Sequence, residues 1–458
     1  MNAAAGRDIV RRSGIMAAGG GPRGGAAAST SRSPGALPTM SAPIPSRDLY
    51  YARLRAVALA AACLFVVTLA FHHGVTLRVI TLATAAAFAF AGGGWRDIPE
   101  LPLRYAWLAW ASVAALSVVF ALDRRVSLIE FRHEILYDFA MFATWFTLAR
   151  HANGGQWLGR TLAVTAAVVL VLGTVMILSG HPYFELGAYG DVGSLSTWLV
   201  SVLPLFLLLS LRARPRSLAR AGIVMLAAGC LAAGFLTLNR VFGLAAAAEI
   251  IVFSLLTIRS WRTSRRSAWM IGIGVLAIGL ALASIPLATE TRIALSAPGT
   301  DLGEFLSGDP RPELWRFALA QIAEHPWLGN GLGKWTSRAL FADEFHDVLR
   351  LHAHNVFLNR ALETGLPGLA AFVILMASVV VAFLRMVRSG EPRAVDTGAA
   401  GLALVVGVLL KNLTDDFFVG QNALLFWSLT GAALGVAARR TGAQVAAPIG
   451  AGSTGRGV

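Results

Sequence analysis

Apolar residues occur along this chain of 458 residues in long blocks that short polar stretches separate. The blocks have lengths suited to a bilayer, which a helix of about 20 residues crosses. Backbone groups in hydrocarbon must pair within the segment, so such blocks form helices. The pattern predicts an all-α polytopic membrane protein with about 12 transmembrane helices. The predicted spans are Leu54–Phe71, Val75–Ala91, Leu103–Leu122, Ile135–Ala149, Leu162–Ser179, Leu195–Leu211, Leu218–Leu238, Val241–Ile258, Trp269–Leu287, Pro367–Leu384, Gly398–Leu413 and Asn422–Ala437.

Five segments follow from this pattern. Residues 1–47 are rich in Ala, Gly, Ser, Pro and Arg without periodicity, which predicts a disordered tail. Residues 48–287 are expected to contain transmembrane helices 1 to 9, and residues 288–354 to form one long loop outside the membrane. Residues 355–437 would then hold a re-entrant segment and helices 10 to 12, and residues 438–458 a second tail.

Composition and charge support a membrane protein over a soluble one. Only 14% of the residues are charged and 56% are hydrophobic, too few charges for a water-exposed surface. The formal net charge of +14 comes almost entirely from arginine, since Lys334 and Lys411 are the only lysines. A surplus of this kind can indicate nucleic-acid binding, so the positions of the arginines must decide its meaning.

The arginines concentrate in alternate connections between the spans, as the positive-inside rule predicts for cytoplasmic loops. This distribution places both termini in the cytoplasm and argues against nucleic-acid binding. Arg124, Arg125 and Arg132 are the exception, because they fall on the predicted outer side. The arginines on the predicted inner side are Arg96, Arg104, Arg150, Arg160, Arg212, Arg214, Arg216, Arg220, Arg259, Arg262, Arg265, Arg266, Arg385, Arg388, Arg393, Arg439 and Arg440.

The long outer loop contains a helical pattern of its own. Leu314, Ala318 and Ile322 recur at helical spacing, and the pattern ends at His325-Pro326. We therefore expect an amphipathic helix lying against the outer face of the bundle. A loop of this length with its own structure is usually functional.

Several common kinds of site are not supported by the sequence. Two cysteines inside apolar runs, Cys63 and Cys230, exclude a disulfide framework. The glycines from Gly329 to Lys334 miss the phosphate-binding loop pattern, and Gly-x-Ser-x-Gly is absent. We expect no cofactor and no metal, although a metal bound by His352 and His354, with His346, is an alternative that spacing alone supports weakly.

Arginine at the outer end of apolar spans is the first candidate for chemistry. Arg240 lies between two spans that have almost no loop between them, and Arg311 begins the helix of the outer loop. A guanidinium binds phosphate oxygens through paired hydrogen bonds and keeps its charge, so both residues are candidates for holding an anion. The alternative is an ordinary interfacial or exposed residue at a helix start.

A histidine at the outer boundary of the membrane is the second candidate. His354-Asn355 comes before a short apolar helix that contains Gly365 and Gly368, and Pro367 is expected to start a new helix. Imidazole takes and gives protons near neutral pH, so His354 could act as a general base. The alternative is a capping or interfacial histidine without chemistry.

These motifs resemble those of the O-antigen ligase family. His-Asn followed after nine residues by Gly-x-x-Gly (His354 to Gly368) resembles the family signature. Arg311-Pro-Glu-Leu-Trp and the segment from His325 to Gly331 resemble the stretch before it, and Thr237-Leu-Asn-Arg240 resembles the helix-end arginine. The resemblance covers roughly residues 50–440, with the specific motifs in about 240–370.

The resemblance implies a GT-C-like enzyme of the bacterial inner membrane, a glycosyltransferase without metal or cofactor. It would transfer O-antigen glycan from undecaprenyl diphosphate to the lipid A-core on the periplasmic side, with inversion. His354 would activate the acceptor hydroxyl, and Arg240 and Arg311 would hold the diphosphate. Further residues implied to contact the substrates are Asn355, Asp415 and Asp416.

One departure from the family and several alternatives stay open. Family members often carry another arginine before the sixth span, whereas residues 184–193 contain none here. Arg124, Arg125 or Arg132 could replace it. O-antigen polymerase and protein O-oligosaccharyltransferase are close alternatives, and a secondary transporter is a more distant one, although the chain shows no repeated halves.

Overall fold

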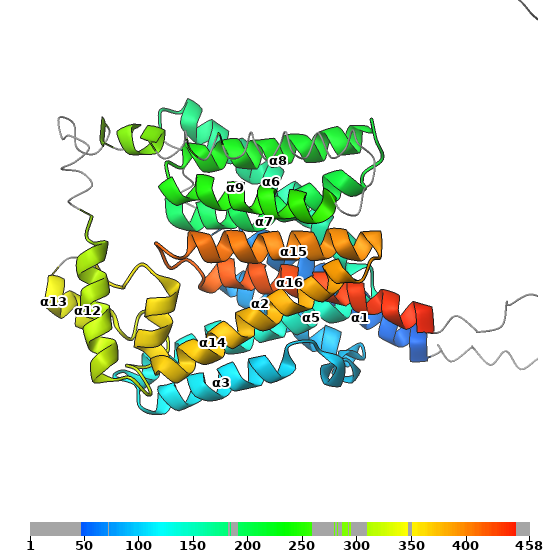
Figure 1. Cartoon of the computed structure of the whole chain (residues 1–458). Coiled ribbons are helices and arrows are strands. Elements are labelled where there is room, and N and C mark those ends of the chain that lie inside the picture. Colours follow the sequence, from blue (N-terminus) through cyan, green and yellow to red (C-terminus); the bar gives the residue numbers. More distant parts are fainter. Residues whose placement is uncertain are drawn as a thin grey trace, which may run out of the picture. The chain divides into compact units, whose positions relative to one another are not determined.

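The protein is an assembly of helices, seen in a computed structural model (Figure 1). The structure describes residues 47–258 and 309–445 except 72, 182–183, 185–190 and 347–349; of residues 259–308 it describes only 279, 282, 286–291 and 293–294. No strand occurs among the described residues, which confirms the predicted all-α fold. Most of the two expected tails and most of the ninth span at 269–287 lie outside the described residues, as does the whole of the expected arginine-rich loop at 259–266.

Helices form where the apolar blocks predict them. Each of the expected spans other than the ninth coincides with a helix, and the predicted and observed ends differ by up to 11 residues, the most at the start of α14. The helices are α1 (Arg47–Thr68), α2 (Val75–Ala91), η1 (Gly94–Arg96), η2 (Ile98–Glu100), α3 (Arg104–Val119), α4 (Arg124–Phe131), the π-helical turn η3 (Arg132–Tyr137), α5 (Asp138–His151), α6 (Gly154–Leu178), α7 (Val192–Arg212), α8 (Leu218–Leu236), α9 (Arg240–Ile258), α12 (Arg311–Glu324), α13 (Arg338–Phe345), α14 (Val356–Arg388), α15 (Pro392–Lys411) and α16 (Gly420–Val445).

Seven helices in the described part of the chain are long and apolar enough to cross a membrane, or eight if α2 is counted with the bent turns after it. This establishes a multi-pass membrane protein, but the predicted number of 12 spans is not confirmed. The helices α3, α5 and α16 are not both long enough and apolar enough to be counted among these spans. The helix α5 is too short, with 14 residues, because the chain before it forms the π-helical turn η3, which contains the buried Glu134.

The long helices lie side by side, and α15 is near their centre (Figure 1). It packs against α7, α9 and α14, and 78% of its most apolar stretch is buried. By contrast, only 22% of the corresponding stretch of α8 is buried. The exposed side of α6 carries valines such as Val164 and Val171, the kind of surface that faces hydrocarbon.

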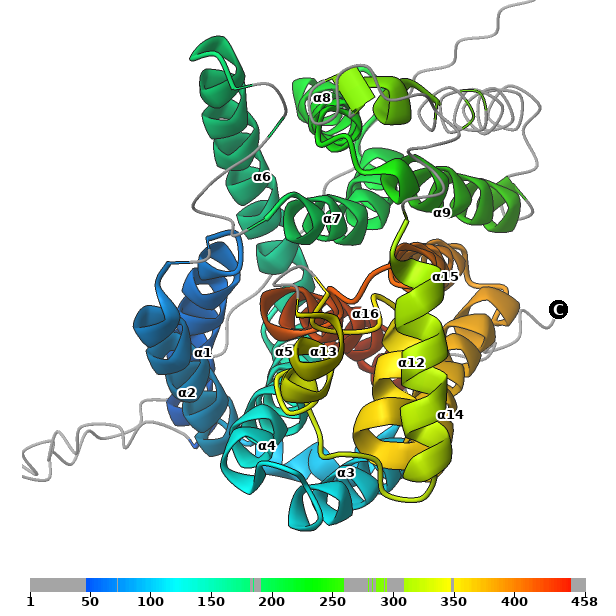
Figure 2. The same ribbon diagram turned by 90° about the vertical axis from the view of Figure 1, so that its left-hand side faces the viewer.

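The predicted outer-loop helix is α12, which stands across one end of the long helices (Figures 1 and 2). Its apolar residues Leu314, Ala318 and Ile322 are buried against α13 and the start of α14. Trp315 fixes α12 further, because its indole N–H donates a hydrogen bond to the carbonyl oxygen of Ala353 at 2.8 Å. The helix pattern read from the sequence is thus confirmed, and it forms a small second core at this end.

Candidate functional site

His354 lies immediately before α14, at the end of the bundle that α12 covers. The next residue, Asn355, caps α14: its side-chain oxygen accepts hydrogen bonds from the backbone N–H groups of Phe357 and Leu358. His354 has a φ of 48°, in the left-handed region that non-glycine residues seldom adopt. Backbone strain of this kind is typical of functional sites, where the surrounding structure holds it.

The imidazole of His354 is oriented by a carboxylate from another helix connection. Its Nδ1 atom lies 3.2 Å from Oδ1 of Asp415, between α15 and α16. Burial raises the pKa of Asp415, but the hydrogen bond from His354 and the charge of Lys411 outweigh burial and bring the pKa below 3.8. Asp415 is therefore ionised at neutral pH and favours the tautomer of His354 with a proton on Nδ1. That tautomer leaves Nε2 able to accept a proton.

His352 supports the same conformation. Its Nδ1 atom accepts the backbone N–H of His354 at 3.1 Å, and the two rings stack with centroids 3.9 Å apart. Burial and the nearby charges of His354 and Lys334 lower the pKa of His352 to about 4. His352 is thus a neutral hydrogen-bond acceptor. In the described parts of the chain, no three His, Cys, Asp or Glu side chains converge as ligands of a metal would.

The two candidate arginines meet at one carboxylate. Asp309 accepts hydrogen bonds from the backbone N–H of Arg311 at 3.0 Å and from its Nη1 atom at 2.9 Å. Nη2 of Arg240, at the start of α9, lies 3.9 Å from the same carboxylate. These three side chains are each about a quarter exposed, so an anion can reach them. Two guanidinium groups and one carboxylate therefore lie together at this point.

The connection between α15 and α16 joins the arginines to the histidine. Nε of Arg311 donates to the carbonyl oxygen of Thr414 at 3.0 Å, and the following residue is Asp415, the partner of His354. A continuous set of contacts therefore runs from Arg240 through Asp309, Arg311 and residues 414–415 to His354. We call it the His354–Arg240 network. It brings together residues from α9, α12, α14 and the 412–419 connection.

Two predicted substrate-contacting residues have internal partners. The amide nitrogen of Asn355 donates to the carbonyl oxygen of Leu413 at 2.8 Å, in addition to the cap it provides. Asp416 is fully buried and accepts a hydrogen bond from Asn359 at 2.5 Å. Both residues therefore tie α14 to the 412–419 connection, and through it they position Asp415.

The predicted break before Pro367 is a kink inside α14 at Gly365 (φ 70°, ψ −179°). A Cβ atom there would lie 2.5 Å from the backbone of Trp327, so only glycine fits. The kink frees the carbonyl oxygens of Leu362 and Glu363, which accept hydrogen bonds from Asn330 and Gly331 at 2.9 Å. The loop that follows α12 is thus joined to α14 by backbone hydrogen bonds.

Gly368 permits a second close contact within the same kink. A Cβ atom at this position would come within 1.9 Å of the hydroxyl of Thr364. The two glycines of the motif therefore shape the kink and hold the loop at the start of α14, and they reach the network only through this packing.

Two residues of this region were not identified as site residues from the sequence. Asp309 lies in the predicted long loop outside the membrane, where the sequence shows no pattern that marks it. Lys334 was set aside with the glycine-rich stretch, yet its Nζ atom lies 3.5 Å from the carbonyl oxygen of Asp416. It also lines a cavity of about 240 Å3 with Glu130, His133, Tyr137 and Trp335. The signal that could have singled it out is its residue type, since Lys334 is one of only two lysines in a chain whose basic residues are mostly arginine.

Arg124 and Arg125 lie at the same end of the bundle as the network. The turn before them contacts the 329–331 loop, since the backbone N–H of Leu122 donates to the carbonyl oxygen of Asn330 at 3.0 Å. Arg132 lies in η3, where its Nη2 atom is 3.4 Å from Nε2 of His133. The start of α4, with Arg124 and Arg125, thus follows a turn that packs against the 329–331 loop.

Comparison with known proteins adds to this geometry. A family model described as O-Antigen ligase matches residues 205–373, a stretch that contains Arg240, Arg311, His354, Gly365 and Gly368. A protein named O-antigen ligase from Pseudomonas aeruginosa is 30% identical over 116 residues. The match covers 24% of this chain and 28% of that protein. The family resemblance read from the motifs is thus confirmed.

Proposed function

Starting from the membership of this chain in the O-antigen ligase family, we propose that it transfers O-antigen glycan from undecaprenyl diphosphate to the lipid A-core. The reaction would occur on the periplasmic side of the inner membrane, without metal or nucleotide and with inversion at the anomeric carbon. The single observation that carries the proposal is the His354–Arg240 network, because it brings two arginines into contact with the carboxylate of Asp309 and links them to a histidine oriented by Asp415.

The arginines have the chemistry that a diphosphate leaving group requires. Negative charge develops on the diphosphate as the glycosidic bond breaks, and prearranged donors stabilise that charge. Arg311 is held at Nε by Thr414 and at Nη1 by Asp309, and Arg240 approaches the same carboxylate. In the proposed reaction these guanidinium groups bind the diphosphate oxygens.

His354 supplies the complementary step at the acceptor. Its Nδ1–H is directed to Asp415, so Nε2 accepts the proton of the acceptor hydroxyl as the oxygen attacks the anomeric carbon. The new glycosidic bond forms as the bond to the diphosphate breaks, and the diphosphate leaves with both electrons of that bond. A single displacement of this kind inverts the anomeric configuration.

In the proposed reaction, Lys334 supplies the third cation in place of the arginine that family members often carry before the sixth span. It lies against the 412–419 connection, directly beside the network. Arg124, Arg125 and Arg132 are the alternative. Replacing these three by glutamine and, separately, Lys334 by glutamine decides between them. Full transfer activity of the triple arginine variant would remove that alternative.

Purified full-length protein with lipid-linked glycan and lipid A-core tests the proposed function. We expect core lipid extended by glycan, with the anomeric configuration inverted. Glycan joined to a second lipid-linked glycan would instead indicate a polymerase, and glycan on a polypeptide a protein glycosyltransferase. In cells, loss of the gene should leave lipopolysaccharide with a bare core while lipid-linked glycan accumulates. Transfer to none of the three acceptors by folded protein would overturn the proposal.

A further inference from the structure

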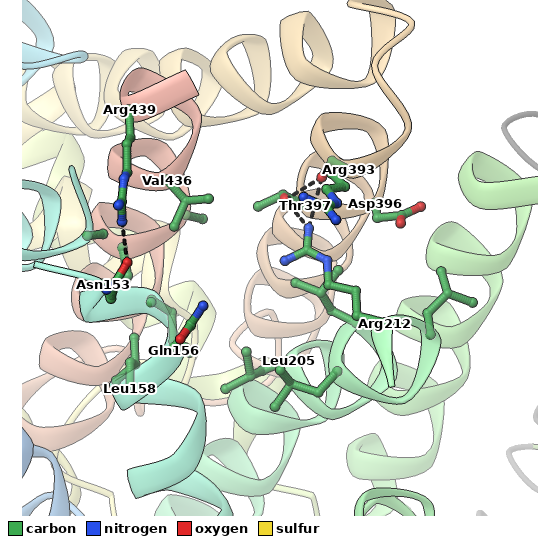
Figure 3. Close-up of a pocket in the computed structure, with 18 residues that line it drawn as sticks. Asn153, Gln156, Leu158, Leu205, Arg212, Arg393, Asp396, Thr397, Val436 and Arg439 are labelled. Carbon is green, nitrogen blue, oxygen red and sulfur yellow. Dashed lines mark hydrogen bonds between the residues drawn. The ribbon is translucent and has the colours of Figure 1, made fainter. Parts of the chain in front are cut away.

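A cavity of about 870 Å3 lies at the end of the bundle opposite the His354–Arg240 network. It is formed by the end of α5, the start of α6, the ends of α7 and α16 and the start of α15. Figure 3 shows Asn153, Gln156 and Arg439 on one side of it and Arg212, Thr397 and Leu205 on the other. We call it the distal cavity.

The distal cavity has an apolar interior and a basic mouth. Leucines from α6, α7 and α16 line it together with Ala432 and Ala433. Its arginines are exposed at the ends of their helices, whereas its aspartate is buried. Three arginines against one aspartate give its lining a positive excess of two charges. The charged lining residues are Arg212, Arg393, Arg439 and Asp396.

Two of the arginines are held in place by hydrogen bonds to neighbouring helices. Nη2 of Arg212 donates to Thr397 at 2.5 Å and to the carbonyl oxygen of Arg393 at 2.8 Å, while Arg439 donates to Asn153 from the opposite side (Figure 3). These hydrogen bonds fix the positions of two guanidinium groups on opposite sides of the mouth. Because three arginines and one aspartate line the cavity, its lining carries an excess of positive charge that favours an anion.

The depth of the distal cavity fits the headgroup region of a bilayer. The helix α15 runs from Pro392 at this cavity to Lys411 near Asp415, over 20 residues. At about 1.5 Å per residue this is about 30 Å, the thickness of the hydrocarbon core. The arginines thus lie at one membrane boundary and the network at the other. The distribution of arginine along the chain predicts that the cavity faces the cytoplasm.

We propose that the distal cavity binds a phospholipid with an anionic phosphate headgroup. The arginines at the mouth would bind the phosphate, and the leucines of α7 would contact an acyl chain. Basic pockets between transmembrane helices on this side of membranes bind such headgroups. The apolar interior favours a lipid over a soluble phosphate, and the excess charge favours an anionic headgroup over a zwitterionic one. This site is distinct from the proposed donor and acceptor sites.

Lipid binding to the full-length protein in detergent tests the site by native mass spectrometry and by melting temperature. The probes are phosphatidylglycerol, phosphatidylcholine with the same acyl chains, and glycerol 3-phosphate. We expect phosphatidylglycerol to bind and to raise the melting temperature. In the double variant Arg212→Gln/Arg439→Gln, about tenfold more phosphatidylglycerol should be needed for the same occupancy, because charge-assisted hydrogen bonds to phosphate are lost.

The control variant Arg385→Gln/Arg388→Gln removes two exposed arginines from the end of α14, outside the distal cavity, and should bind as the unmodified protein does. Ala433→Phe fills the apolar interior without a change in charge and should also weaken binding. Equal binding of phosphatidylcholine, equal stabilisation by glycerol 3-phosphate, or an equal loss in the control would overturn the proposal. Should the double variant not fold, undiminished binding by folded Ala433→Phe would overturn it.

Discussion

Nδ1 of His354 lies 3.2 Å from Oδ1 of Asp415, although 61 positions separate the two residues in the chain. The contact depends on the packing of the start of α14 against the connection between α15 and α16. Asn355, bonded to Leu413, and Asn359, bonded to Asp416, hold that packing on either side of the pair. The pair is therefore built by the same contacts that fix the end of the helix bundle.

The pair makes His354 and Asp415 the first residues to replace. We expect His354→Ala to lower the turnover rate of glycan transfer about a hundredfold or more, because a positioned base contributes at least this much. Asp415→Asn should lower it less, since the imidazole remains. Asp343→Asn, at an exposed position of α13, is the matched control and should leave transfer unchanged. Full transfer by folded His354→Ala protein would refute the proposed role.

Arg311 is expected to bind the lipid-linked donor. Arg311→Lys keeps the charge but loses the fixed geometry that Thr414 and Asp309 give the guanidinium. The KM for the donor should rise about tenfold, the equivalent of one charge-assisted hydrogen bond. Arg316→Lys is the matched control, because Arg316 lies exposed on the same helix, where its Nε donates a hydrogen bond to the carbonyl oxygen of Pro312. Equal effects of the two substitutions on KM would argue against a donor site at Arg311.

Gly365 should be intolerant of any side chain. Gly365→Ala places a Cβ atom 2.5 Å from the backbone of Trp327 in a backbone conformation that disfavours it. We expect a loss of about 2 kcal/mol or more in the free energy of unfolding. Gly222→Ala is the control: this helical glycine has open space around it, and alanine there should be neutral or stabilising by up to about 1 kcal/mol. Thermal unfolding in detergent compares the two, and equal melting temperatures would contradict the prediction.

The raised pKa of Glu130 predicts that the stability of the protein changes with pH. Burial and the charge of Glu134 raise the pKa of Glu130 from 4.5 to about 7. The folded protein therefore holds this proton more tightly than the unfolded protein, so stability falls as pH rises from about 4.5 to about 7. Glu130→Gln should reduce the fall in melting temperature over this range, whereas Glu344→Gln, at an exposed position of α13, should not. An unchanged pH profile in Glu130→Gln would show that Glu130 does not titrate in this window.

Much of the fold follows from local pattern. The helix α2 has the predicted bounds Val75–Ala91, and the apolar face of α12 was predicted from the spacing of Leu314, Ala318 and Ile322. Helix formation depends on neighbours three and four positions away, which the sequence displays directly. The buried ion pair of Glu134 with Arg360, just before the fourth span, could not be predicted, because no hydropathy pattern reports an ion pair.

The site was only partly predictable, because contacts between distant residues leave no local pattern in the sequence. His354, Arg240 and Arg311 could be singled out because charge and imidazole at the end of an apolar span need an explanation. Asp309 and Lys334 could not, since their importance lies in which groups they contact. The sequence by itself determined the all-helical membrane fold, the positions of the helices and the break near Pro367. The tertiary structure alone decided that Asp309 joins two arginines and that Asp415 orients His354. Helical periodicity is local, whereas those contacts depend on how distant helices pack.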